Sequence, residues 1–326
     1  MEYVKLGNTG MDISPVCLGC MSFGEVKPDF HQWVLNERDS REIIKQALDL
    51  GINFFDTANV YSYGTSEEFL GRAIGDYAAR DDVVIATKVF SRMRKTPNGA
   101  GLSRKTILSE IDHSLRRLNM EYVDLYIIHR WDYDTPIEET MEALHDVVKA
   151  GKARYIGASA MYAWQFQKAQ HVAEMHGWTR FISLQNHYNL IYREEEREMM
   201  PLLRDQKVAA TPYSPLAAGR LSRLPHHKTA RLESDRTAIS KYDATADVDR
   251  PIIERVAQVA QKHGVSMTGV ALAWLLHQPQ VTSPVVGVTK QSHLKDAVNA
   301  ADINLTSEDL AFLAAPYVPH KIVGAL

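Results

Sequence analysis

Four side chains that can hold or move a proton stand close after short apolar segments of the sequence. Asp56, Lys88 and His129 directly follow three such segments, and Tyr61 lies in the loop that Asp56 begins. A phenol with an ordinary pKa of about 10 donates a proton poorly near neutral pH, and an adjacent ammonium lowers that value. We therefore interpret Tyr61 as a proton donor that Lys88 assists. Asp56 would hold the ammonium in place, and His129 would orient a carbonyl oxygen.

This set of residues suits the reduction of a carbonyl group. Hydride that arrives at a carbonyl carbon leaves negative charge on the oxygen, which needs a proton or strong hydrogen-bond donors. A Schiff-base aldolase with Lys88 as its nucleophile is an alternative, but it needs a desolvated amine rather than one paired with Asp56. A metal-dependent hydrolase fits less well, because no two metal-binding residues stand together after an apolar segment.

The segments that carry these residues alternate with amphipathic helices. Strands are expected at residues 16–18, 53–55, 83–87, 123–128, 155–158, 181–184, 208–211 and 283–286. Helices are expected at residues 40–50, 66–74, 103–118, 137–149, 164–176, 194–205, 252–263, 268–277 and 293–300. Strict alternation implies a parallel sheet, and eight strand–helix units favour a closed (β/α)8 TIM barrel over an open sheet. No break in composition marks a boundary, so residues 1–326 are predicted to form one domain.

Two segments depart from this alternation. Residues 3–13 are predicted to form a small N-terminal β-hairpin that closes the lower end of the barrel, with its turn at Gly7-Asn8. Residues 215–250 are rich in Arg, His, Ser and Asp and have no clear period. We expect them to form a long loop after the seventh strand, and loops of that length usually take part in function.

The loops after the last two strands suit a nucleotide cofactor. No GxGxxG motif follows an early strand, so a Rossmann site is not expected. Barrels often hold phosphate with the loops after strands seven and eight, which here are residues 214–219 and 287–290. Lys290 and His293 could meet an extra ribose phosphate, which favours NADP(H) over NAD.

The two cysteines and the overall composition argue against several other classes of protein. Cys17 and Cys20 have CxxC spacing, but no second pair or nearby His completes a metal site, so we expect buried thiols on opposite faces of one strand. A formal net charge of −3 argues against a nucleic-acid binder. We see no secretory signal and no apolar run of the roughly 20 residues that span a bilayer, so we expect a cytoplasmic protein that does not enter a membrane. Its expected partner is a small carbonyl compound, and it would act as a monomer or a small homo-oligomer.

Several motifs, taken in order, resemble those of the aldo-keto reductases over essentially the whole chain. They are residues 55–71, Thr87-Lys88, Ile128-His129, 157–159, Leu184-Gln185 and 213–216. The likeness is greatest to the bacterial YajO-type reductases, in residues 18–21, 129–133 and 189–196. The resemblance implies the barrel fold and an NADPH-dependent reductase whose tetrad is Asp56, Tyr61, Lys88 and His129. Some relatives with this fold are nicotinamide-sensing subunits that regulate a partner, and the sequence leaves that alternative open.

The resemblance also implies which residues surround the tetrad. Ser159 and Gln185 would hold the nicotinamide amide, and Tyr213 would stack on its ring. The full set expected to contact the cofactor is Cys20, Met21, Asp56, Ser159, Gln185, Tyr213, Ser214, Leu216, Gly219, Leu221, Gly287, Thr289, Lys290, His293 and Asp296. Two positions depart from the family pattern: Ala160 stands where many members have Asn, and His293 stands where they often have Arg or Gln.

Loops after the strands supply the residues expected to line the substrate mouth. These are Phe23, Phe90, Arg130, Trp131, Tyr133 and Tyr162. Their aromatic rings suit aryl or short-chain aldehydes. Arg130 could meet a phosphate or carboxylate, or it could be a rim residue tied to a neighbouring Asp.

Overall fold

The computed structural model describes residues 1–27, 30–227 and 235–324. Its main sheet has eight strands in the order β10-β3-β4-β5-β6-β7-β8-β9, and neighbouring strands are parallel. The two ends of the sheet meet, because the backbone N–H groups of Thr282 and Val285 donate to the carbonyl oxygens of Ala210 (2.8 Å) and Pro212 (2.9 Å). The predicted (β/α)8 barrel is therefore confirmed. Its strands are β3 (Cys17–Gly19), β4 (Phe54–Asp56), β5 (Val84–Val89), β6 (Val123–Ile128), β7 (Ala153–Ser159), β8 (Phe181–Gln185), β9 (Ala209–Ala210) and β10 (Val285–Gly287).

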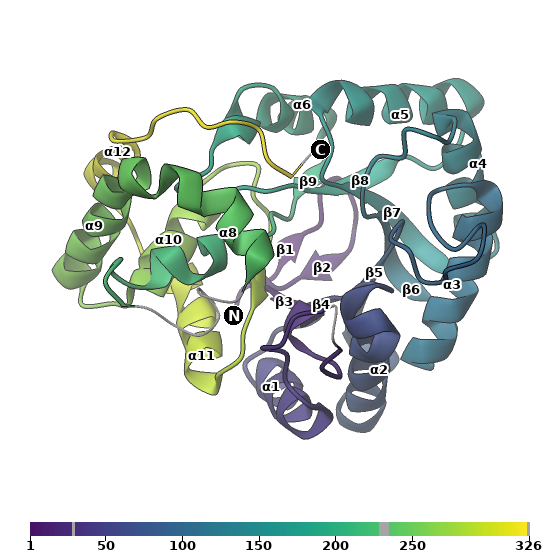
Figure 1. The fold of residues 1–326 in the computed structure, drawn as a ribbon, viewed down its shortest axis with the longest axis horizontal. Coiled ribbons are helices and arrows are strands. Elements are labelled where there is room, and N and C mark those ends of the chain that lie inside the picture. The colour runs from purple at the N-terminus through teal and green to yellow at the C-terminus, as the bar shows by residue number, and fades with distance from the viewer. Residues whose placement is uncertain (28–29, 228–234, 325–326) are drawn as a thin grey trace.

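Helices surround this barrel, as Figure 1 shows. The α3 helix illustrates why these segments are helical: Ser103 caps its first turn by accepting a hydrogen bond from Thr106 N at 3.3 Å. Ile107, Ile111 and Leu118 are fully buried on one face of it. The helices that follow strands are α1 (Glu37–Asp49), α2 (Thr65–Tyr77), α3 (Arg104–Leu118), α4 (Ile137–Lys149), α5 (Ala163–His176), α6 (Met199–Gln206), α10 (Met267–Leu276) and α11 (Gln291–Asn299). The others are α8 (Arg236–Tyr242), α9 (Ala246–His263) and α12 (Ser307–Ala314).

The predicted N-terminal hairpin is present and packs against the interior of the barrel. β1 (Val4–Lys5) pairs antiparallel with β2 (Asp12–Ile13), and Leu6 between them is fully buried among side chains of the strands. Its turn is longer than the predicted Gly7-Asn8 pair, because Leu6 N donates to the carbonyl oxygen of Met11 at 3.1 Å. The hairpin therefore closes one end of the barrel and leaves the carboxyl ends of the strands free for a site.

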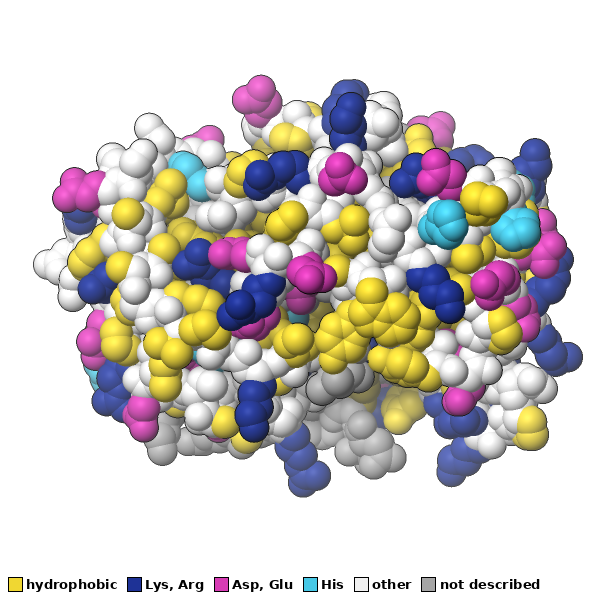
Figure 2. All heavy atoms as spheres, turned by 90° about the horizontal axis from the view of Figure 1, so that it is seen from above, with side chains coloured by type: hydrophobic (Ala, Val, Ile, Leu, Met, Phe, Trp, Pro, Cys, Tyr) yellow, Lys and Arg dark blue, Asp and Glu magenta, His cyan; other side chains and the backbone are white. Residues whose placement is uncertain are grey.

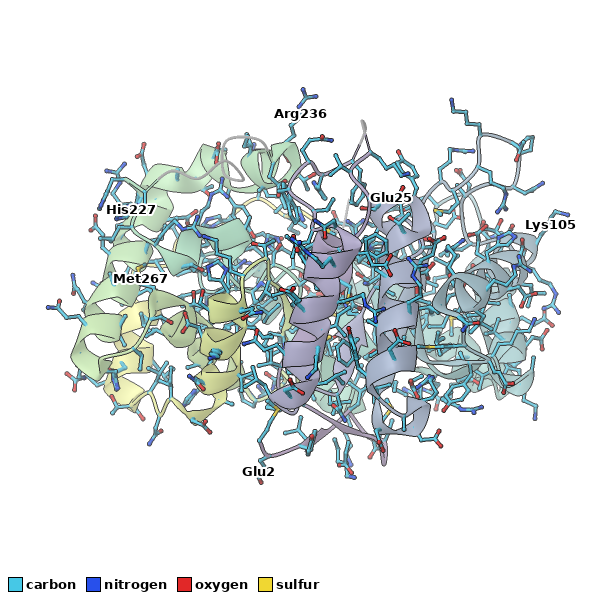
Figure 3. The ribbon with its side chains drawn as sticks, turned by 90° about the horizontal axis from the view of Figure 1, so that it is seen from below. Glu2, Glu25, Lys105, His227, Arg236 and Met267 are labelled. Atoms are coloured by element: carbon cyan, nitrogen blue, oxygen red, sulfur yellow. The ribbon has the colours of Figure 1, made fainter. Side chains whose placement is uncertain are left out.

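That other end of the barrel carries the loops after the strands. Figure 3 shows Glu25, from the loop after β3, and Arg236, from the start of α8, at one end of the molecule. Glu2, which precedes the hairpin, lies at the opposite end. In barrels of this kind the chemistry sits at the end where the strands finish.

The predicted long loop after the seventh strand is partly helical. Of residues 215–250, positions 228–234 lie outside the described residues, while α8 and the first turn of α9 fall within 235–250. Asp235 caps α8 by accepting a hydrogen bond from Ala238 N at 3.0 Å. The sequence pattern misses these turns because their residues are mostly polar and have no apolar period. It also misses α12, where Thr306 and Asp309 cap each other's backbone N–H groups at 3.1 Å.

Both cysteines are free and buried. Cys17 lies in the apolar cluster inside the barrel, and Cys20 lies in the larger cluster between strands and helices. Burial raises the pKa of both thiols well above the ordinary value. Among the described residues no group of His, Cys, Asp and Glu side chains is arranged to hold a metal ion. The prediction of two buried thiols is confirmed, but the two residues do not share one strand, because Cys20 belongs to a short 3-10 turn just after β3.

Charges of both signs are spread over the face that Figure 2 draws. Lys and Arg side chains lie among Asp and Glu, and hydrophobic side chains form a patch near the middle. Within the described ranges, no helix combines the length and the hydropathy that a membrane-spanning segment needs.

Candidate active site

Three of the four predicted catalytic side chains meet at the carboxyl ends of β4 and β5. Lys88 lies in β5, Asp56 is the last residue of β4, and Tyr61 begins a short 3-10 turn after β4. The Lys88 ammonium donates to Asp56 Oδ1 (2.5 Å), to the carbonyl oxygen of Thr57 (2.9 Å) and to Tyr61 Oη (3.2 Å). All three donor positions of the ammonium are therefore used, and one of them points at the phenol.

His129 completes the predicted tetrad beside the phenol. Its ring meets the Tyr61 ring edge to face, with the centroids 5.9 Å apart, and its backbone N–H donates to Val89 O at 2.9 Å. The Nδ1 atom is buried and has no hydrogen-bond partner among the described residues. Burial, reinforced by the charges of Lys88 and Arg130, keeps the pKa of His129 well below its ordinary value. The imidazole is therefore neutral and retains one N–H donor.

The charge states in this cluster differ in one respect from the sequence-based expectation. Burial raises the pKa of Tyr61 above its ordinary value, and the Lys88 ammonium offsets only part of that rise. Lys88 thus lowers the pKa of Tyr61 as expected, but the desolvation of a buried phenolate outweighs one neighbouring ammonium. Burial alone would lower the pKa of Lys88, but Asp56 and Tyr61 together raise it above the ordinary value. The phenol thus keeps its proton, and the lysine keeps its charge.

Side chains from β7 and β8 extend the hydrogen-bonded chain that begins at Asp56. Gln185 Nε2 donates to Asp56 Oδ2 at 2.9 Å, and Ser159 Oγ donates to the carbonyl oxygen of Gln185 at 2.7 Å. Ala160, which follows, has a left-handed backbone with φ of +49°. Asn186 holds the next turn, because its amide accepts from Met161 N (3.3 Å) and donates to Met161 O (3.0 Å). Asn186 was not among the predicted site residues, although it follows Gln185 directly.

Tyr213, predicted to stack on the nicotinamide, is itself one ring of a stack. The His187 ring lies 5.4 Å from Tyr213 at 14°, and 4.1 Å from Tyr192 at 13°. His187 Nε2 lies 2.6 Å from the hydroxyl of Tyr242, and burial keeps the pKa of His187 well below its ordinary value. Three parallel rings therefore fix the plane of Tyr213. Sequence reasoning did not find His187, because no strand or motif marks its position.

The two predicted phosphate loops have backbones that can hold an anion. Residues 214–219 contain four positions with positive φ, at Ser214 (+54°), Ala217 (+48°), Ala218 (+54°) and Gly219 (+93°). Three of these are not glycine, and such strained positions gather at binding sites. At the other loop α11 begins after Lys290 with no side-chain cap. His293 N donates to the carbonyl oxygen of Lys290 at 3.1 Å, which leaves the amides of Gln291 and Ser292 for a ligand.

A basic group stands beside that helix start. Burial and the charges of Lys290 and Arg223 lower the pKa of His293. Arg223 was not among the predicted residues. Met21, Leu216, Thr289 and Asp296 are half-buried, while Gly287 is exposed. Cys20 and Leu221 are fully buried in the main apolar cluster. Both residues are therefore core residues beneath the loops, and their contact with the cofactor stays a prediction.

Comparison with known proteins settles the family. A model of the aldo/keto reductase family matches residues 15–316. The chain belongs to the aldo-keto reductase family. It is 43% identical to a versiconal hemiacetal acetate reductase of Aspergillus parasiticus, over 99% of this chain and 98% of the relative. It is 41% identical to an aldo-keto reductase of Alternaria alternata, over 97% and 91% of the two chains. It is 42% identical to a putative aryl-alcohol dehydrogenase of Schizosaccharomyces pombe, over 99% and 98%. These relatives are fungal, so they support the family without singling out the bacterial YajO-type group.

Most of the residues predicted to line the mouth of this aldo-keto reductase are partly exposed. Phe90, Trp131 and Tyr162 are half-buried, and Tyr133 is 67% exposed, with its hydroxyl accepting from Gln165 Nε2 at 2.9 Å. Phe23 is the exception, because it is fully buried in the main apolar cluster. Phe23 is therefore part of the core, and its contact with a substrate stays a prediction.

Arg130 is held at the rim but is not paired with a neighbouring Asp. Its Nη1 donates to the carbonyl oxygen of His129 at 3.0 Å. The nearest Asp in sequence, Asp132, instead accepts from Leu102 N (2.7 Å) and from Thr135 Oγ1 (2.8 Å). The guanidinium therefore keeps its remaining donors for another group.

Proposed function

We propose that this aldo-keto reductase uses NADPH to reduce aldehydes or ketones to alcohols, with Tyr61 as the proton donor. The observation that carries the proposal is the buried chain from Asp56 through Lys88 to the Tyr61 hydroxyl, with a neutral His129 beside it. A hydrogen-bonded proton donor next to a fixed positive charge is what the reduction of a carbonyl group requires.

Each member of the tetrad would have a separate task. The Tyr61 hydroxyl gives its proton to the carbonyl oxygen as negative charge develops there. The Lys88 ammonium, which Asp56 holds in place, stabilises the phenolate that remains. The neutral imidazole of His129 donates a hydrogen bond to the same oxygen and orients it. The charged state of Lys88 speaks against the aldolase alternative, because a protonated amine is no nucleophile.

The loops around the tetrad fit a nicotinamide cofactor, which would supply the hydride when bound. Ser159, Gln185 and Tyr213 lie where they could hold its nicotinamide end. The positive-φ residues 214–219 and the open start of α11 suit its phosphates. The basic group of Lys290, His293 and Arg223 supports a preference for NADPH over NADH, since an extra phosphate brings negative charge.

Aromatic aldehydes are the substrate class that we propose. The half-buried rings of Phe90, Trp131 and Tyr162 support it, as does the similarity to a putative aryl-alcohol dehydrogenase. Three expectations from the sequence remain proposals. They are the likeness of residues 189–196 to YajO-type reductases, a cytoplasmic location, and a monomeric or small homo-oligomeric state.

A direct test follows the loss of NADPH absorbance in the presence of a small panel of aromatic aldehydes, with NADPH binding measured separately by fluorescence. We expect binding and turnover, with NADPH favoured over NADH. Binding without turnover of any aldehyde would instead favour a nicotinamide-sensing subunit. Failure to bind either cofactor would contradict the proposal altogether.

A further inference from the structure

Two cationic side chains from segments far apart in the sequence, Arg130 and Lys241, lie near the predicted catalytic and cofactor residues. Arg130 follows β6 directly after His129, and its guanidinium donates to the His129 carbonyl oxygen. Lys241 belongs to α8, and its ammonium donates to Tyr213 Oη at 3.2 Å and lies 4.6 Å from the centre of that ring. Both cations are half-buried. One cation therefore lies beside His129 in the loop after β6, and the other reaches Tyr213 from α8.

Neither cation has an acidic partner among the residues that the structure describes. Within the described part of the chain, Arg130 donates to the carbonyl oxygen of His129 and Lys241 donates to the hydroxyl of Tyr213, both neutral oxygens. Other arginines around the barrel are paired in the ordinary way, such as Arg220 with Asp243 at 2.5 Å. Two like charges that are half-buried without a direct ion pair raise the free energy of the folded protein, and a bound anion would lower it.

The charge of Arg130 acts on Lys241 as well as on the residues of the site. The Arg130 guanidinium is close enough to lower the pKa of Lys241, and its charge also acts on Tyr61 and Tyr213. Burial together with Arg130 lowers the pKa of Lys241 to about 8, against an opposing effect of Asp235. The charge of Lys241 also contributes to the low pKa of His187.

We infer that Arg130 and Lys241 form an anion-binding subsite that takes a carboxylate or phosphate group of the carbonyl substrate. This inference rests on the proposed reductase function. The anion could in principle belong to the cofactor pyrophosphate. We assign it to the substrate because Arg130 neighbours His129 in the chain and acts on Tyr61, the reacting end of the site. The phosphate loops at residues 214–219 and at the start of α11 already offer other donors to the cofactor.

The test compares para-carboxybenzaldehyde with its methyl ester, which has the same ring and aldehyde but no charge. For the wild type at neutral pH we expect kcat/KM to favour the acid by at least about tenfold, because hydrogen bonds between charged groups are strong. Arg130→Gln and Lys241→Met should each lose most of this preference for the acid over the ester. The exposed Arg116 and Lys168 offer matched controls, and Arg116→Gln and Lys168→Met should leave the ratio unchanged. Because both substrates are measured on the same protein, partial loss of folded enzyme cancels in the ratio.

The pH dependence gives an independent arm of the test. The wild-type ratio should fall as the pH rises through about 8, because Lys241 loses its proton there while the substrate carboxylate stays charged. Lys241→Arg should keep the ratio across that range, since a guanidinium stays protonated. A ratio in the wild type that does not change with pH would contradict the role of Lys241.

Failure of this inference can be told apart from failure of the proposed function. If the wild type reduces the ester but does not favour the acid, the anion subsite is wrong and the reductase assignment stands. If the variants weaken NADPH binding and leave the ratio unchanged, the cations serve the cofactor and the inference is overturned. If neither aldehyde is reduced, the proposed function fails, and this inference fails with it.

Discussion

Replacing Lys88 by Met should leave the Asp56 carboxylate buried without its counter-charge. The two groups are 0% and 1% exposed and lie 2.5 Å apart. Removing one member of such a buried pair costs roughly 3–5 kcal/mol of unfolding free energy, because the remaining charge cannot be solvated. Met has a similar length, so little of the loss would come from a cavity. The double variant Lys88→Met, Asp56→Asn should recover most of the loss, since the buried amide carries no charge.

The assay is urea unfolding of the wild type, both single variants and the double variant, followed by circular dichroism. A double-mutant cycle then gives the coupling between the two positions, which we expect to be about 2 kcal/mol or more. Activity should fall together with stability in Lys88→Met, by at least roughly a hundredfold in kcat, since the phenolate loses its stabilising charge. A loss of stability below about 1 kcal/mol for Lys88→Met, or strictly additive effects in the double variant, would refute the reasoning.

Three further predictions concern positions around the site and at the edge of the fold. Ala160→Asn should raise the unfolding free energy by up to about 1 kcal/mol, because Asn tolerates the left-handed backbone at φ +49° better than Ala does. It should also lower the Kd for NADPH, because many members of the family have Asn at this position. Thermal unfolding and titration with NADPH would measure the two effects. His187→Leu should raise the Kd for NADPH by up to about tenfold, since Tyr213 loses the ring stacked behind it; an unchanged Kd would disprove the positioning role. Asp309→Asn should lower stability at neutral pH, because hydrogen bonds from Lys262 and His263 hold the pKa of Asp309 below its ordinary value. A group with a lowered pKa stabilises the fold above its unfolded value of about 3.9, so the difference between Asp309→Asn and wild type should shrink as the pH falls below about 4.

Much of the barrel could be predicted from the periodicity of apolar residues. The β6 strand (Val123–Ile128) and the α4 helix (Ile137–Lys149) have the predicted bounds, because an unbroken apolar run and a clean helical period mark them. The helices α8 and α12 could not be predicted in this way. They depend on side-chain caps such as Asp235 and Thr306 more than on an apolar face.

The candidate site was predictable where it lies at the ends of strands. Asp56 and Lys88 stand out because each is polar directly beside apolar strand residues, and the barrel geometry brings such positions together. Lys241 and Tyr242 stand in a segment without a period, so only the folded chain reveals that they reach Tyr213 and His187. The direction of the net pKa shift of Tyr61 could not be predicted from the sequence, because burial is a property of the tertiary structure.

Three residues that were predicted to contact the cofactor or the substrate are fully buried. Phe23, Cys20 and Leu221 follow strands or lie in the loop expected at the cofactor, which is where exposed contacts are normally found. Each instead packs into the main apolar cluster. A position in sequence relative to a strand end fixes the region of a side chain, but it does not fix which way the side chain points.

The central claim is that the Tyr61 hydroxyl delivers the proton to the carbonyl oxygen. The most direct measurement compares NADPH-dependent aldehyde reduction by wild type, Tyr61→Phe and Tyr63→Phe, with NADPH binding measured for all three. Tyr63 is the matched control, since it lies in the same short turn but is 46% exposed. We predict that the kcat of Tyr61→Phe is roughly 100-fold to 10,000-fold lower than that of the wild type, although the variant still binds NADPH. The kcat of Tyr63→Phe should stay close to the wild-type value. A Tyr61→Phe variant that reduces aldehydes at the wild-type rate would contradict the account.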